Sequence, residues 1–88
     1  MQQREFTIEN KLGLHARAAA KFVKCASQFD SEIQVGKDAM TVNGKSIIGV
    51  LLLAAPKGSR ILVIADGADE ASALAALAEL ITGRFGED

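Results

Sequence analysis

The chain has 88 residues, of which 49% are hydrophobic and 24% are charged, and its formal net charge is −1. This length fits one domain over 1–88 and supports a core without a disulfide or a metal. The small net charge offers no field that attracts nucleic acid, and no apolar run approaches the about 20 residues of a membrane helix. Because the N-terminus lacks an apolar signal and Cys25 is the only cysteine, we expect a cytoplasmic protein in which Cys25 has no redox role.

The first third of the chain predicts a strand followed by a helix. Residues 4–9 alternate polar and apolar side chains, which is the period of a strand with one buried face. A loop over 10–14 comes next. The alanine-rich run from Ala16 then favours an amphipathic helix that ends near Ser27 or Gln28.

The middle of the chain predicts a hairpin and a short helix. Residues 32–36 and 39–43 alternate around a Gly-Lys-Asp segment that is rich in turn formers. Ser46 is a good N-cap for a helix in the apolar run 47–55, which Pro56 closes. The β-branched residues of that run leave a strand as the alternative.

The last third predicts a buried strand and a final helix. Residues 60–65 are almost continuously apolar, which suits the centre of a sheet. Asp66 or Asp69 can cap the helix that follows, and Gly83 can end it. The apolar face of this helix consists of Ala73, Leu74, Leu77, Leu80 and Ile81.

The predicted element order is therefore βαββαβα. For so short a chain, the economical arrangement is an α+β fold in which a four-stranded antiparallel sheet carries its helices on one face. Leu62 and Ile64 would then lie on the uncovered face. Either they are scattered surface residues, or a second copy of the chain covers them in a homodimer.

The only histidine, His15, lies in Gly13-Leu14-His15-Ala16-Arg17, at the predicted start of the first helix. Histidine has an ordinary pKa of about 6.5, so much of it is a neutral nucleophile near neutral pH. A helix N-terminus attracts anions, and the guanidinium of Arg17 matches the spacing of phosphate oxygens. The motif therefore predicts a phosphoryl-accepting histidine, and the alternative is a partly exposed surface or capping residue.

Residues 39–46 end like a Walker A loop, but Ala39 replaces its first glycine and the βαβ context is missing. We therefore reject nucleotide binding. A serine at a helix N-terminus is also a natural site for a regulatory phosphate, although most such serines only cap. The helix after Ser46 has more apolar residues than one buried stripe needs, so some of them should form an exposed partner surface.

The segment from Gly13 to Ala19 closely resembles the active-site signature of the HPr phosphocarriers of the bacterial phosphoenolpyruvate-dependent phosphotransferase system. Lys45 to Val50 resembles that family's regulatory serine region, and the resemblance covers essentially the whole chain. It implies an open-faced β-sandwich with three helices and phosphorylation of His15 on Nδ1. One position departs from the family pattern: Ala18 stands where proline usually presets the helical φ angle.

The resemblance also implies the partners: Enzyme I as the phosphoryl donor, a IIA-type acceptor in sugar uptake, and an HPr kinase/phosphorylase that acts on Ser46. The backbone of Ala16 and Arg17 would bind the phosphoryl group, with no metal or cofactor. Partners would dock on a surface that consists of Ala16, Ala20, Lys24, Ile47, Ile48 and Leu51. We expect a phosphoryl carrier rather than an enzyme, and a monomer. A nitrogen-related regulatory phosphocarrier and an interaction module with an inert His15 remain the alternatives.

Overall fold

The structure is a computed structural model that describes residues 1–87. Its elements, in chain order, are β1 (Gln2–Thr7), α1 (Ala16–Ala26), β2 (Glu32–Lys37), β3 (Met40–Asn43), α2 (Ile47–Leu52), β4 (Arg60–Asp66), α3 (Glu70–Thr82) and the short 3-10 helix η1 (Arg84–Gly86). The predicted order βαββαβα is confirmed, and the run after Ser46 is a helix and not a strand.

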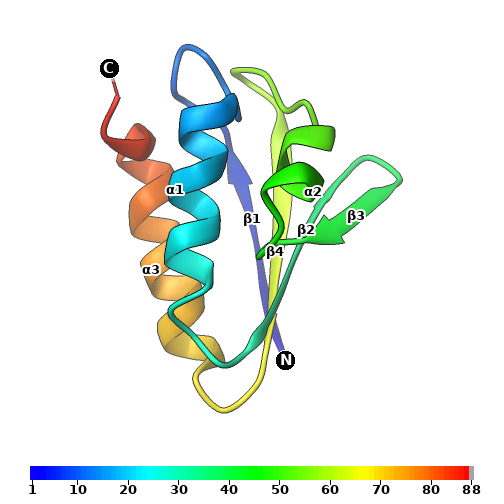
Figure 1. Cartoon of the computed structure of the whole chain (residues 1–88), viewed down its shortest axis with the longest axis vertical. Helices are drawn as coiled ribbons and strands as arrows, with labels where there is room; N and C mark the ends of the chain where they lie inside the picture. Colours follow the sequence, from blue (N-terminus) through cyan, green and yellow to red (C-terminus); the bar gives the residue numbers. More distant parts are fainter. Residues whose placement is uncertain (88) are drawn as a thin grey trace.

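The four strands form one sheet in the order β1-β4-β2-β3, and every neighbouring pair is antiparallel. The continuously apolar β4 lies inside the sheet, between β1 and β2, as its composition predicted. Helices α1 and α3 lie side by side across one face, and α2 lies next to α1 near the β2–β3 hairpin (Figure 1). The predicted α+β class, with an antiparallel sheet and its helices on one face, is confirmed.

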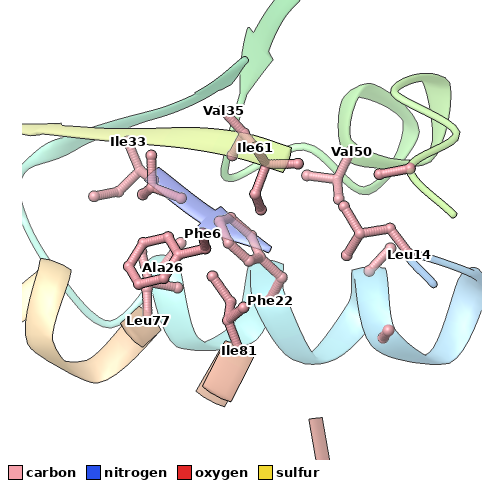
Figure 2. Packing of buried hydrophobic residues seen from close by; sticks show 14 of the residues in the cluster. Phe6, Leu14, Phe22, Ala26, Ile33, Val35, Val50, Ile61, Leu77 and Ile81 are labelled. Carbon is pink, nitrogen blue, oxygen red and sulfur yellow. The ribbon is translucent and has the colours of Figure 1, made fainter. Parts of the chain in front are cut away.

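One aliphatic core joins the sheet to the helices. Figure 2 shows Phe22 of α1 close to Phe6 of β1, with Leu77 of α3 beside them. Small residues on the buried face of α1, among them Ala18 and Ala19, let the helix backbone approach the sheet closely. The core therefore fixes the rotation of α1 and, with it, the direction in which the helix start points.

The outer face of the sheet is less apolar than the spacing of β4 suggested. Leu62 and Ile64 are only half-buried there, and most of their cross-strand neighbours are polar. Ile64 pairs with Gln3 on one side and with Gln34 on the other, while Leu62 pairs with Glu5. The two side chains are thus partly accessible on the outer face of the sheet.

Two element ends differ from the sequence prediction. The first strand runs over Gln2–Thr7 rather than 4–9, because the backbone of Ile8 bonds to Gly58 and Ser59 in a loop instead of continuing the ladder. The helix after Ser46 ends at Leu52 rather than near residue 55, since Ala54 adopts a left-handed φ of 49°.

The predicted capping hydrogen bond of the last helix is also absent at Asp69. Asp69 occupies the N-cap position of α3, but its side chain makes no capping hydrogen bond. Its carboxylate instead accepts hydrogen bonds from the backbone N–H groups of Asp30 and Ser31 and from the Ser31 hydroxyl. These bonds hold the pKa of Asp69 below its ordinary value and tie the loop before β2 to the start of α3. Gly83 ends the helix as predicted.

The loop before α1 is held against the chain segment that follows α2. Gly13 has a φ of 67°, and a Cβ atom built there would lie 2.4 Å from the carbonyl oxygen of Ala55. The next residue, Leu14, is buried and donates its backbone N–H to the same carbonyl at 2.9 Å. Only glycine fits this approach, so the loop has one conformation.

After Gly83 the end of the chain forms η1, which packs against α3 and α1. Phe85 is fully buried, although it has a left-handed φ of 54°. The ammonium of Lys21 on α1 donates to the Phe85 carbonyl oxygen at 2.6 Å. As a result, the C-terminal segment lies at the same end of the molecule as the start of α1 (Figure 1).

Substitution of Gly13 tests the close approach in the loop before α1. We expect Gly13→Ala to lower the free energy of unfolding by about 2–5 kcal/mol, because the new methyl group adds a clash to the left-handed strain. Gly58→Ala is the matched control: its φ is 91°, but no atom lies within 4 Å of the added methyl group. It should cost only about 1–2 kcal/mol. Urea unfolding measures both, and equal losses would contradict the role of the contact.

Substitution of Phe85 tests the anchor of the C-terminal segment. Because its ring is fully buried, Phe85→Ala should lower the free energy of unfolding by about 3–5 kcal/mol. Phe29 is only partly buried, so Phe29→Ala should cost clearly less in the same urea titration. A loss for Phe85→Ala no greater than that for Phe29→Ala would show that the segment is not anchored through this ring.

Candidate functional site

His15 is the N-cap residue of α1. Its backbone is extended, with φ of −77° and ψ of −179°, and its carbonyl accepts the N–H of Ala19 at 2.8 Å. The imidazole makes no capping hydrogen bond, and among residues 1–87 the N–H groups of Ala16 and Arg17 have no acceptor. The side chain of His15 is 27% exposed. A partly accessible imidazole therefore lies beside backbone donors that an anion can satisfy.

A carboxylate from the far end of the chain holds one edge of that imidazole. Nε2 of His15 lies 2.7 Å from Oε2 of Glu87, and Nδ2 of Asn10 lies 3.0 Å from the other oxygen, Oε1. The hydrogen bonds from His15 and then from Asn10 lower the pKa of the Glu87 carboxyl, so this group is ionised at neutral pH. The site thus has a negative group on one side of the ring.

Asn10 is fully buried, and its amide group is fixed by both of its N–H donors. Besides Glu87, Nδ2 donates to the carbonyl oxygen of Gly13 at 2.7 Å, inside the loop before α1. Within the described part of the chain, Oδ1 of Asn10 has no hydrogen-bond partner. The residue connects the loop conformation to the orientation of the Glu87 carboxylate.

The positive group of the site lies on the exposed side of α1. Arg17 is exposed, and over residues 1–87 it makes no ion pair or side-chain hydrogen bond. Ala16, Ala20 and Lys24 are also exposed on this helix. A guanidinium two positions after the histidine can turn toward an anion held at the helix start.

Ser46 is the N-cap of α2, as predicted: its Oγ accepts the backbone N–H of Gly49 at 3.1 Å. The preceding Lys45 does not extend toward solvent as a phosphate-binding lysine would. Its ammonium donates to the carbonyl oxygen of Phe29 at 2.6 Å. The segment therefore serves here as a structural link between β3 and α2, with a half-exposed serine hydroxyl at the helix start.

Helix α2 exposes most of its apolar side chains. Val50 is its one buried residue, and Ile48 is 72% exposed. The prediction that several of these residues reach solvent is confirmed. We call this surface the α2 patch; it consists of Ile47, Ile48, Leu51 and Leu52. Because α2 packs against α1, the patch lies next to the helix that begins at His15.

Other features of residues 1–87 add no second reactive centre. Cys25 is half-buried on α1, and burial raises the pKa of its thiol, which lowers the reactive thiolate fraction. In this range no three His, Cys, Asp or Glu side chains gather as metal ligands would, and no helix is long and apolar enough to cross a bilayer.

Sequence reasoning identified His15 and Arg17 but missed Asn10 and Glu87. Glu87 is 72 residues from His15, so no local spacing indicates their contact. The one available signal was Phe85, a large apolar residue after the predicted end of the last helix, which suggests that the chain folds back onto the core.

The chain is similar to known proteins over almost its whole length. Residues 2–83 match the family model described as the PTS HPr component phosphorylation site. Phosphocarrier protein HPr of Neisseria meningitidis serogroup A is 56% identical over 87 residues, which cover 99% of this chain and 98% of the relative.

Solved structures show the same likeness. The crystal structure of HPr-C-His from Thermoanaerobacter tengcongensis is 46% identical, covers 100% of this chain and 99% of its own, and superposes with a TM-score of 0.97. A crystal structure of an HPr dimer from the same organism is 47% identical, covers 99% of this chain and 100% of its own, and has a TM-score of 0.80. This chain therefore belongs to the HPr family, and it is a phosphoryl carrier of the phosphotransferase system rather than an enzyme.

Proposed function

We propose that His15 accepts a phosphoryl group from phospho-Enzyme I and passes it to a IIA-type acceptor. The observation that carries this proposal is the position of the imidazole at the N-terminus of α1, beside the unpaired N–H groups of Ala16 and Arg17. The dipole of an eleven-residue helix favours a negative group at that end. The exposed Arg17 supplies a full positive charge nearby.

The transfer needs positioning more than acid–base chemistry. A lone pair of the neutral imidazole attacks phosphorus in line, and the bond from phosphorus to the donor's nitrogen breaks as the new N–P bond forms. The N–H groups of Ala16 and Arg17, with the guanidinium of Arg17, bind the equatorial oxygens. Ala18 keeps a backbone N–H that proline would lack, at a fully buried position in the same turn.

The exposure of the site suits a carrier that works in both directions. With 27% of the His15 side chain exposed, the donor and the acceptor can each reach the ring in turn. A deep pocket would hold the phosphoryl group more firmly and would slow its release. The shallow helix terminus stabilises the group while leaving phosphorus open to attack by the next partner.

Partners would dock on the outer face of α1 together with the α2 patch. The α1 side is formed by Ala16, Ala20 and Lys24, which are all exposed. Small alanines and an apolar patch next to the reactive side chain allow another protein surface to approach closely. Because α2 packs against α1, the two surfaces adjoin and one partner can cover them at once.

Ser46 would then control docking through charge. A phosphate on its hydroxyl adds about −1.5 to −2 charges at the start of α2, beside the apolar α2 patch. Ser46 as a whole residue is half-exposed, which supports access by an HPr kinase/phosphorylase. The added charge would have to lose its hydration when an apolar partner surface approaches, which weakens docking.

Phosphorylation with labelled phosphoenolpyruvate and Enzyme I tests the role of His15. We expect acid-labile label on the wild-type protein and none on His15→Ala. Arg17→Ala should lower the transfer rate by about 10²-fold, because the developing charge loses one cationic donor. Lys37→Ala removes the same charge from the β2–β3 hairpin and should transfer at the wild-type rate.

Equal label on His15→Ala would show that another residue carries the phosphate. No label on the wild type would leave an interaction module as the function. Separate additions of sugar-specific IIA and nitrogen-related IIA to the labelled protein then identify the branch, because the cognate acceptor should remove the label fastest.

Treatment with ATP and an HPr kinase tests Ser46. The wild type should gain one phosphate and Ser46→Ala none, while Ser46→Ala still accepts phosphate from Enzyme I. Ser46→Asp should lower the rate of that transfer by about tenfold, since it places a negative charge at the docking surface. Modification of Ser46→Ala to the same extent as wild type would contradict the regulatory assignment.

A further inference from the structure

We propose that Glu87 is a positioning residue for the transfer reaction: its carboxylate determines which nitrogen of His15 carries the proton and leaves the other nitrogen free to take the phosphoryl group. This inference rests on the proposed function of His15. It adds a group from the C-terminal segment that works through the imidazole and does not touch the phosphoryl group.

The two oxygens of the Glu87 carboxylate have different partners. Oε1 accepts from Nδ2 of Asn10 at 3.0 Å, and Oε2 lies 2.7 Å from Nε2 of His15. Asn10 is fully buried, and its second N–H is bound to the carbonyl oxygen of Gly13 at 2.7 Å. Since both partners of Nδ2 are acceptors, the amide cannot be reversed. Asn10 therefore holds one carboxylate oxygen and orients the other toward the imidazole.

The backbone around Glu87 is held equally firmly. Its N–H donates to the carbonyl oxygen of Arg84 at 2.9 Å, and the buried ring of Phe85 fixes the turn to the core. Lys21 binds the Phe85 carbonyl from α1, the same helix that His15 caps. The imidazole at the N-cap of α1 and the segment that carries the carboxylate are thus both held by the same helix. The side chain of Glu87 is only 11% exposed.

This contact selects one tautomer of the neutral imidazole. An ionised carboxylate has no proton to donate, so Nε2 must carry the hydrogen of the short contact. The lone pair of the neutral ring is then on Nδ1. When Nδ1 forms its bond to phosphorus, the donor's N–P bond breaks, the donor ring keeps its own proton, and the proton on Nε2 stays in place. The phosphorylated ring becomes positively charged, and the carboxylate at 2.7 Å stabilises that charge.

Glu87→Gln changes the hydrogen-bond pattern with almost no change in shape. The amide has one acceptor oxygen, which the buried Asn10 requires, so its NH₂ group would face Nε2 of His15. Nε2 would then accept, and the proton would move to Nδ1. We expect ring ¹⁵N shifts, recorded where the ring is neutral, to show mainly Nε2–H in the wild type and mainly Nδ1–H in Glu87→Gln. Phosphorylation by Enzyme I should slow by about tenfold or more in the variant.

Glu9→Gln is the matched control, because it removes the same charge from an exposed side chain that adjoins Asn10 in the sequence. It should keep the wild-type tautomer and rate. Glu87→Ala provides a second variant, which has neither the carboxylate nor the NH₂ group of glutamine. The His15 ring of this variant should show a mixture of tautomers. Urea unfolding of each variant checks that the fold is retained.

The proposal requires both effects in Glu87→Gln. An unchanged tautomer, or a changed tautomer with the wild-type rate of transfer, would overturn it. The tautomer measurement uses unphosphorylated protein, so it tests whether Glu87 sets the tautomer of His15 even where Enzyme I places no label on the wild type. The absence of label on the wild type would contradict the proposed function and not the contact between Glu87 and His15.

Discussion

The site depends on the unpaired N–H groups at the start of α1. Every α-helix opens with backbone donors that its own carbonyls cannot reach, and a side chain at the N-cap often accepts from one of them. His15 occupies that place but makes no such bond, so among residues 1–87 the donors of Ala16 and Arg17 have no acceptor. A phosphoryl group on the imidazole would supply the acceptor that the helix lacks. On the function proposed for His15, the affinity for phosphate would follow from helix geometry and an N-cap side chain that makes no capping bond.

The rest of the chain keeps that helix start in one place. The core sets the rotation of α1, and the close contact of Gly13 with Ala55 fixes the loop before it. The buried Phe85 anchors the C-terminal segment at the same end of the molecule (Figure 1). A carboxylate then lies on one side of the imidazole and a guanidinium lies on the helix beside it. Of these two groups, only the carboxylate contacts the ring, at 2.7 Å, while the exposed Arg17 lies two positions along the helix.

The sequence predicted the order and type of the elements because each has its own periodicity and end signals. The alternation in β2 and β3, the alanine content of α1 and the continuous apolar run of β4 are local properties. The sequence could not locate some ends and caps, because tertiary contacts compete there. Asp69 is at the N-cap position of α3, yet its carboxylate accepts hydrogen bonds from the backbone N–H groups of Asp30 and Ser31 instead. Ile8 lies outside the strand because its backbone forms hydrogen bonds with loop residues.

The same division holds for the site. His15 and Arg17 are two positions apart, so the sequence by itself determined that a nucleophile and a cation share one helix start. It also placed Ser46 at the next helix start, where the hydroxyl indeed caps α2. Only the tertiary structure decided that Glu87 meets His15 and Asn10, because the contact with His15 spans 72 residues and depends on a segment that the buried Phe85 anchors to the core. The spacing of residues in the sequence determines which side chains share one helix or strand, whereas contacts between distant residues depend on how the core packs.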